Sequence, residues 1–291
     1  MAAKLFGRRN LIKRQRTVLS TASMRKLVIG SENAEFQIIQ SLKLNRSKRN
    51  EKHEIFVEGT ECIKQALKAD LEITRIIMAD IDRVSDWAAG VIQTHEQAKI
   101  IEMSPQLYAL LSDRTNPSEL LITARVKAEK LNGLNLPECP FIVVFDRPSD
   151  FGNLGSIVRS ANAFNVDAIF ITGHGIDVYE PKVIRASLGS VFHTRIVYIE
   201  STQVLDEFIK KEKERTSMLV IGTDSGGSVS IKHERLKKPV MVIVGNEAKG
   251  MSVHLKDICD EVVQIPISGS VNSLNAACAA SIVMWEIYRN S

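Results

Sequence analysis

The segment 141–159, FIVVFDRPSDFGNLGSIVR, decides the fold class of this chain of 291 residues. It begins with an unbroken apolar run over 141–145, which predicts a buried strand. A polar loop with two glycines, Gly152 and Gly155, follows that run. A continuous apolar run is typical of a strand in a parallel sheet that is covered on both faces. The segment therefore predicts an α/β sheet with a polar loop at the carboxyl end of one strand.

Similar patterns extend in both directions from this segment. Towards the C-terminus, strands are expected at 168–172, 194–199, 218–222, 240–244 and 262–265. Towards the N-terminus, helix and strand patterns alternate from residue 33, and the stretch 130–140, KLNGLNLPECP, has the Gly, Pro and Asn content of a linker. Four parts are expected: a basic arm (1–32), an α/β domain (33–128), a linker (129–140) and a second α/β domain (141–291).

The basic residues are unevenly distributed along the chain. The formal net charge is +4, but residues 1–26 contain eight basic side chains and no acidic one. A second basic cluster, expected to form a loop over 45–52, includes Arg46, Lys48 and Arg49. These local clusters point to a polyanion partner such as RNA. We interpret the acid-free N-terminus as an RNA-contacting arm, with an organellar targeting segment as the alternative.

The composition argues against several classes of protein. Four scattered cysteines form neither a C-x-x-C pair nor a cluster with histidine, so no metal and no disulfide framework are expected. No apolar run approaches the roughly 20 residues that cross a bilayer, and a cytoplasmic protein without membrane contact is expected. The motifs G-x-G-x-x-G, G-x-x-x-x-G-K-[ST] and G-x-S-x-G do not occur, which excludes the common dinucleotide, P-loop and serine hydrolase sites.

Three loops rich in Gly, Ser and Asn each follow a predicted buried strand. They are 146–159, 244–250 and 265–275. Open α/β sheets bind ligands at the carboxyl ends of their strands, so the three loops are expected to form one pocket. The sequences NLGSIVR (153–159), GNEAKG (245–250) and IPISGSVNSLN (265–275) resemble, in order and spacing, the three signature motifs of SpoU/TrmH RNA 2′-O-ribose methyltransferases. The stretches 185–190 and 274–277 are most similar to the avilamycin-resistance ribosomal RNA methyltransferase branch.

This resemblance implies a fold, a cofactor and a set of site residues. It implies a deep trefoil-knot (SPOUT) methyltransferase domain, preceded by a ribosomal-protein-like α/β RNA-binding domain, in a homodimer that uses S-adenosylmethionine. The residues that it assigns to the cofactor are Thr223, Gly245, Asn246, Gly250, Ile265, Ile267 and Leu274. The residues that it assigns to the chemistry are Arg159, Asn153, Glu247, Ser273 and Asn275. Arg46, Lys48, Arg49 and Arg159 are expected to bind RNA.

Three of these residues carry a specific physical expectation. A guanidinium holds its proton above about pH 12, so Arg159 is expected to grip the target phosphate; a structural salt bridge is the alternative. Glu247 is expected to be structural, bridging backbone donors with Arg159 as a further partner. Glycine at position 245 is expected to let the backbone approach the cofactor closely. Before Gly152 the family often has proline, whereas this chain has Phe151, a difference expected to affect specificity.

Three functions remain open from the sequence. The leading hypothesis is a 2′-O-methyltransferase of large-subunit ribosomal RNA. A tRNA ribose 2′-O-methyltransferase of the same fold is the enzyme alternative, and a non-catalytic RNA-binding or ribosome-assembly factor is the other. The presence of Asn153, Arg159, Ser273 and Asn275 disfavours the last of these.

Overall fold

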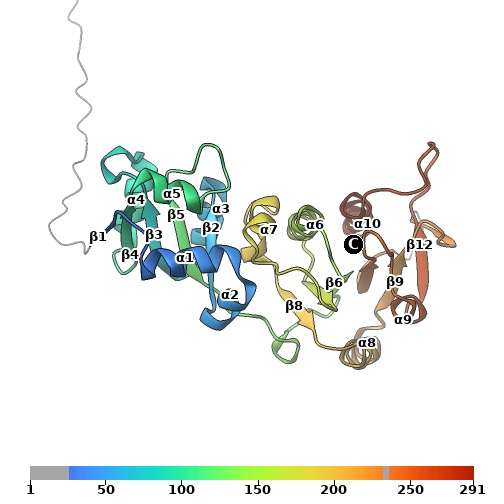
Figure 1. The fold of residues 1–291 in the computed structure, drawn as a ribbon. Coiled ribbons are helices and arrows are strands. Elements are labelled where there is room, and N and C mark those ends of the chain that lie inside the picture. The colour runs from blue at the N-terminus through green and yellow to red at the C-terminus, as the bar shows by residue number, and fades with distance from the viewer. Residues whose placement is uncertain (1–25, 232–235) are drawn as a thin grey trace, which may run out of the picture.

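The chain folds into two α/β domains, each built on its own sheet. The computed structural model describes residues 26–231 and 236–291, so the part of the predicted arm over 1–25 lies outside the described residues. Figure 1 shows the two domains side by side, the N-terminal one in blue to green and the C-terminal one in yellow-green to red. Among the helices of the described residues, none has the length and apolar character that crossing a bilayer requires.

The N-terminal domain is a five-stranded mixed sheet with helices on both faces. Its elements are β1 (Lys26–Ile29), α1 (Ala34–Leu44), α2 (Arg46–Lys52), β2 (Glu54–Glu58), α3 (Thr60–Lys68), β3 (Ile73–Met78), η1 (Ile81–Arg83), α4 (Asp86–Thr94), β4 (Lys99–Met103), α5 (Pro105–Leu111) and β5 (Leu121–Arg125). The strand order is β1-β4-β3-β5-β2, with β5 antiparallel to both of its neighbours. Phe56 of β2 faces the cluster under α1 and α5, whereas Ile55 and Val57 face α3.

Two expectations for the first 52 residues are wrong. The arm was expected to extend to residue 32, but residues 26–29 form β1, which pairs in parallel with β4. This edge strand has a single buried side chain, Ile29, and its apolar run is only three residues long. The expected loop 45–52 contains α2, whose N-cap Asn45 accepts a hydrogen bond from the backbone of Lys48. This helix is almost entirely polar, so its sequence shows no apolar periodicity.

The C-terminal domain is a seven-stranded sheet in which every described pairing is parallel. Its elements, after a short turn η2 (Leu131–Gly133), are β6 (Phe141–Asp146), α6 (Phe151–Ala163), β7 (Ala168–Thr172), α7 (Pro181–Ala186), η3 (Ser190–His193), β8 (Ile196–Ile199), α8 (Thr202–Thr216), β9 (Leu219–Thr223), β10 (Val229–Ser230), β11 (Val240–Val244), α9 (Val253–Asp257), β12 (Glu261–Gln264) and α10 (Ala276–Asn290). The strand order is β10-β12-β9-β11-β6-β7-β8. The predicted parallel α/β domain is confirmed, and the trefoil knot stays a prediction.

Strand β6 explains why its sequence is continuously apolar. Phe141, Val143 and Phe145 face the cluster that contains the buried residues of α6, α7 and α10. Ile142 and Val144 face the opposite cluster, which contains the buried residues of α8 and α9. Because both faces of the strand are covered, neither set of side chains can be polar.

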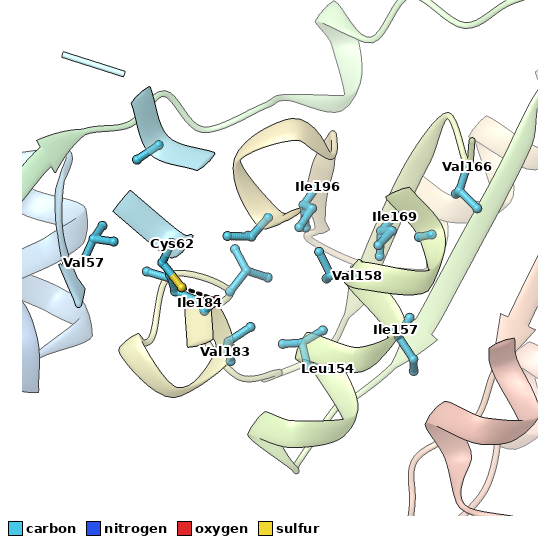
Figure 2. Close-up of a cluster of buried hydrophobic side chains, with 14 of the residues drawn as sticks. Val57, Cys62, Leu154, Ile157, Val158, Val166, Ile169, Val183, Ile184 and Ile196 are labelled. Carbon is cyan, nitrogen blue, oxygen red and sulfur yellow. Dashed lines mark hydrogen bonds between the residues drawn. The ribbon is translucent and has the colours of Figure 1, made fainter. Parts of the chain in front are cut away.

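The two domains share one apolar core. Figure 2 shows Leu154 and Val158 of α6 close to Val183 and Ile184 of α7, with Cys62 of the N-terminal domain against the same group. The Cys62 thiol lies 3.5 Å from the carbonyl oxygen of Ile184, and burial raises its pKa to about 11. Such a thiol stays protonated at neutral pH and acts as a small apolar side chain.

A buried arginine adds an electrostatic connection across the same junction. Arg49 is 3% exposed, and its Nε lies 2.7 Å from Oδ2 of Asp177 while its Nη2 lies 2.6 Å from Oε2 of Glu180. Its Nη1 donates to the carbonyl oxygens of Leu42 and Lys43, at 3.0 Å each. All three nitrogens of this guanidinium donate to acceptors inside the protein. The prediction that Arg49 binds RNA is therefore wrong, because its charge is already paired and buried.

Replacing Arg49 with alanine should destabilise the whole chain. Asp177, only 7% exposed, would then be left buried without its cation. We expect the free energy of unfolding, measured by denaturant titration, to fall by about 3–5 kcal/mol. The control is K48A on the same helix, whose surface pair with Glu51 should contribute less than about 1 kcal/mol. Equal losses in the two variants would contradict the role assigned to Arg49.

Candidate functional site

The three glycine-containing loops meet at one edge of the C-terminal sheet. They follow β6, β11 and β12, and a fourth polar segment follows β9, the strand between β11 and β12. A cavity of about 280 Å³ opens at this edge, close to the lower end of the roughly 300–1,000 Å³ typical of small-molecule sites. It is lined by Thr223, Asp224, Ser225, Val244, Gly245, Asn246, Glu247, Gly250, Val263, Ile265, Ile267, Ser273, Leu274, Ala276, Ala279 and Val283.

The structure brings together all the residues predicted to bind the cofactor. Thr223, Gly245, Asn246, Gly250, Ile265, Ile267 and Leu274 all line this cavity. Two polar residues that the sequence analysis missed, Asp224 and Ser225, also line it. Their signal was a polar stretch directly after a buried strand, which lacked a phosphate-binding pattern. The contribution of α10 through Ala279 and Val283 had no signal, since these residues belong to an ordinary apolar helix pattern.

The walls of the cavity combine two kinds of surface. Apolar side chains come from the ends of β11 and β12 and from Leu274, which is 37% exposed. Polar groups come from Asp224, Ser225 and Asn246. S-adenosylmethionine combines a flat purine with a polar ribose and a charged amino-acid group, so the donor set fits this cofactor. Among the described residues, no three His, Cys, Asp or Glu side chains are gathered as metal ligands would be.

Gly245 and Gly250 close a tight turn after β11. Asn246 and Gly250 form an isolated antiparallel bridge, and Gly250 has a positive φ of 65°. A Cβ on Gly245 would lie 2.4 Å from the backbone nitrogen of Met251. Glycine at 245 is therefore required by the turn itself, and its expected close approach to the cofactor stays a prediction. Asn246 fixes the turn to the first loop, since its Nδ2 donates to the carbonyl oxygen of Arg147 at 2.7 Å.

Glu247 joins the three motif loops. Its carboxylate accepts hydrogen bonds from the hydroxyl of Ser149 at 2.7 Å and from the backbone nitrogens of Ser149 and Asp150 at 3.2 Å. It also accepts from Nδ2 of Asn153, whose Oδ1 in turn accepts from Nδ2 of Asn275 at 2.8 Å. Oδ1 of Asn275 caps the first turn of α10. The expected bridging of backbone donors by Glu247 is present, and both asparagines are fixed in orientation by it.

A buried carboxylate holds the base of the first loop. Asp146, 2% exposed, accepts hydrogen bonds from Arg147, from the hydroxyl of Thr172 at 2.8 Å and from the backbone of Ser252 at 2.9 Å. Burial opposes its ionisation, but these hydrogen bonds and the adjacent guanidinium outweigh it and lower the pKa of Asp146 below its usual range. An ionised Asp146 therefore connects the ends of β6 and β7 to the segment that begins α9.

Arg159 lies outside the cavity. It is exposed on α6, and its guanidinium has neither a hydrogen bond nor an ion pair with any described residue. The expected contact between Glu247 and Arg159 is therefore absent, and so is the alternative of a structural salt bridge. A cation without a protein partner, one helix away from the cavity, is available to bind an anionic group of a substrate.

The other residues predicted to bind RNA lie on α2 at the domain junction. The Nη1 of Arg46 donates to the carbonyl oxygen of Gly175 at 2.8 Å, and its guanidinium carbon lies 5.3 Å from the ring centroid of Tyr198. Lys48 is exposed, paired only with Glu51 at 2.8 Å. Of the three predicted α2 residues, Arg46 and Lys48 are exposed and Arg49 is buried, and Arg46 is also hydrogen-bonded to the junction.

Comparisons with known proteins agree with this geometry. Residues 140–285 match the model of the SpoU rRNA Methylase family, and residues 33–122 match that of the SpoU L30e-like domain. A 23S rRNA (uridine(2479)-2′-O)-methyltransferase of Streptomyces viridochromogenes is 34% identical over 90% of this chain and 91% of its own length. A putative TrmH family tRNA/rRNA methyltransferase of Bacillus subtilis is 28% identical over 80% of this chain and 95% of its own length.

Two solved structures of RNA methyltransferases are also similar to this chain over most of its length. The crystal structure of the SpoU methyltransferase AviRb from Streptomyces viridochromogenes, in complex with the cofactor AdoMet, has a TM-score of 0.82 at 33% identity and covers 89% of this chain and 98% of that chain. A crystal structure described as an RNA 2′-O ribose methyltransferase has a TM-score of 0.76 at 27% identity, over 91% of this chain and 99% of that chain.

Glu247→Gln should loosen the loops without unfolding the protein. The amide would present donor hydrogens to a site that now receives only donors, from Ser149, Asp150 and Asn153. We expect the affinity for S-adenosylmethionine, measured by titration calorimetry, to fall roughly tenfold, the effect of one charged hydrogen bond. K249A, an exposed change in the same turn, is the matched control and should bind normally. Unchanged affinity in E247Q would show that this carboxylate does not shape the cavity.

Proposed function

Because the chain belongs to the SpoU rRNA methylase family, we propose that it transfers a methyl group from S-adenosylmethionine to a ribose 2′-hydroxyl of large-subunit ribosomal RNA. The observation that carries the proposal is the cavity formed by the three motif loops, with an unpaired arginine on the adjoining helix. When bound, the cofactor supplies an electrophilic methyl group, so a ribose hydroxyl placed in line with it is the acceptor.

The residues around the cavity have distinct parts in this reaction. The turn 245–250 and the apolar wall at Ile265 and Leu274 hold the donor. Asn153 and Asn275, fixed by their mutual hydrogen bond, lie at the rim where the ribose must enter, and Ser273 lines the cavity beside them. Orientation by such fixed amides lowers the entropic part of the barrier. No group there needs to change its protonation state.

Arg159 binds the phosphate of the target nucleotide in this proposal. Its guanidinium has two parallel donors that match a phosphate and keeps its proton throughout. Gripping the phosphate places the 2′-hydroxyl of the same nucleotide at the cavity. The hydroxyl proton then leaves to phosphate or water, because arginine cannot accept it at neutral pH.

The nature of the RNA follows from the relatives and from the N-terminal domain. The Streptomyces relative acts, by its name, on 23S rRNA, and the chain covers nine-tenths of it. The N-terminal domain is fixed to the C-terminal domain through Arg49 and the shared core, which suits a large folded RNA that contacts both. The bacterial relatives also favour the cytoplasm as the compartment.

Tritiated methyl transfer to total RNA tests the function directly. Purified 23S rRNA, 16S rRNA and tRNA are offered separately, and the methylated ribose is then mapped. Label in 23S rRNA at one 2′-oxygen is the expected result. Label in tRNA alone would select the tRNA alternative. No label in any fraction, with S-adenosylmethionine bound in calorimetry, would reject the enzyme proposal for these RNAs.

Arg159→Lys tests whether the planar guanidinium positions the target nucleotide, separately from the binding of S-adenosylmethionine. Lysine keeps the charge but loses the planar pair of donors, so turnover at saturating RNA should fall roughly a hundredfold while the affinity for S-adenosylmethionine is unchanged. The matched control is R195K, at a partly exposed arginine that donates to the carbonyl oxygen of Asn135 in the linker. Near-normal turnover of R159K would remove the phosphate-gripping role.

A homodimer is the second part of the proposal. Trp285 and Tyr288 on α10 are 49% and 40% exposed, and their ring centroids are 5.9 Å apart. Phe164, at the end of α6, lies 5.7 Å from both rings. Ile282 extends this aromatic group by one turn and is 40% exposed. An exposed apolar surface of this kind marks a protein interface, and here it lies on the two helices that flank the site.

Trp285→Glu should disrupt that dimer. A charge placed in the interface would be buried without a partner, so sedimentation equilibrium should show a monomer where the wild type is a dimer. L110E, a change at a residue of α5 that is 55% exposed in the N-terminal domain, should leave the dimer intact. A wild-type protein that sediments as a monomer would refute the dimer, and a dimeric W285E would move the interface elsewhere.

A further inference from the structure

Phe151 and Lys182 form an exposed pair beside the site. The ring of Phe151 is 36% exposed at the first residue of α6, and the Nζ of Lys182, at the second residue of α7, lies 5.4 Å from its centroid. Lys182 is exposed and makes neither an ion pair nor a hydrogen bond with any described side chain. Its ammonium is thus held only by the weak attraction of an aromatic face in water.

The pair lies next to the residues that form the rim of the cavity. Asp150, the residue before Phe151, donates its backbone N–H to Glu247 at 3.2 Å. Asn153, two residues after Phe151, is hydrogen-bonded to Asn275. Figure 1 shows α7 between the N-terminal domain and α6, with α10 on the other side of α6. An RNA that contacts the N-terminal domain and enters the cavity therefore crosses the ends of α6 and α7, where this pair lies.

Packing between the helices does not need an aromatic ring at this position. The close contact between α6 and α7 is made one turn later, at Gly155, where an added Cβ would lie 2.4 Å from the Cβ of Ala186. Phe151 stands outside that contact and remains partly exposed. A single exposed apolar residue is ordinary in itself. What distinguishes this one is the unpaired cation over its ring and its place beside Asn153.

We propose that Phe151 and Lys182 form a subsite for an unpaired nucleobase of the substrate RNA. The base stacks on the ring of Phe151, and Lys182 leaves the ring to contact the adjoining phosphate. Stacking on an aromatic side chain is how proteins hold unpaired bases, and it is stronger than an exposed contact between a cation and a ring. The lysine can make this exchange because its charge sits on a flexible stem and has no other partner.

The position of Arg159 on the same helix fits this subsite. It lies eight residues after Phe151, which is roughly 12 Å along a helix axis. Helix α6 and the adjoining Lys182 thus offer an aromatic ring and two cations that have no ion pair among the described residues, a combination that suits single-stranded RNA. The subsite rests on the proposed function for its ligand class, but its location and its composition do not depend on turnover.

Three substitutions test the ring and the cation. Phe151→Leu keeps an apolar side chain without a stacking surface, so kcat/KM for methyl transfer to 23S rRNA should fall roughly tenfold. Phe151→Trp should retain most of the wild-type value, since it keeps the ring. Lys182→Gln should lower RNA affinity severalfold and reduce its salt slope by about one. In all three, calorimetric affinity for S-adenosylmethionine should equal that of the wild type, which shows that the fold is intact.

A second readout does not depend on catalysis. The added indole of F151W should be quenched when 23S rRNA binds, beyond the change seen for Trp87 and Trp285 in the wild type. The matched control is K64Q, because Lys64 lies 5.7 Å from the ring centroid of Trp87 in the N-terminal domain. K64Q should behave as the wild type.

The outcomes separate this proposal from the proposed function. Absence of methyl transfer in the wild type, with extra quenching in F151W, would reject the function and retain the base subsite. Normal kcat/KM in F151L, equal loss in F151L and F151W, or no extra quenching would overturn the stacking role. An effect of K64Q as large as that of K182Q would show a general charge effect and remove Lys182 from the subsite.

Discussion

Parallel pairing of the C-terminal strands is the constraint on which the site depends. Because β12, β9 and β11 are neighbours and run in the same direction, the segments that follow them all leave from one edge of the sheet. Residues 223, 245 and 265 are thereby brought together although more than 40 positions separate the first from the last. The cavity is a direct product of this arrangement, and α10 closes it by packing back along α6.

Carboxylates and amides then hold the loops in place. Glu247 receives donors from the first motif, and Asp146 receives donors from Thr172 and Ser252. These carboxylates accept hydrogen bonds from uncharged donors or from Arg147, and neither of them forms an ion pair with Arg159. The carboxylates of the loops find their partners within the loops, and the guanidinium of Arg159 is therefore without an ion pair among the described residues. Asn153 and Arg159 lie on the same helix, but only Asn153 is hydrogen-bonded within this framework.

Much of this architecture was predictable, for physical reasons. The continuous apolar run of β6 gave the parallel sheet, because a strand covered on both faces has no polar side chains. The ordered motifs predicted seven residues that the structure places in the lining of one cavity, and their contact with the cofactor stays a prediction. Family resemblance, and not periodicity, supplied the identity of the ligand.

Other features could not be predicted from local pattern. Arg49 looked like one more cation in a basic cluster, and only the tertiary fold places Asp177 and Glu180 against it. Strand β1 has one buried residue and no alternation, so it could not be told from a tail. The Phe151–Lys182 pair follows from the meeting of two segments that are 31 positions apart, and spacing says nothing about that meeting.

The buried Arg49 junction has a consequence for how a substrate is chosen. With a shared core and a buried ion pair between them, the two domains cannot reorient without exposing both, so the distance from the N-terminal surface to the cavity is constant. In the proposed reaction, a fixed distance of this kind selects a ribose by its separation from a second feature of a folded RNA. A chimera with the N-terminal domain of a relative would need the matching junction residues. Without them, the distance between the N-terminal surface and the cavity would no longer be fixed.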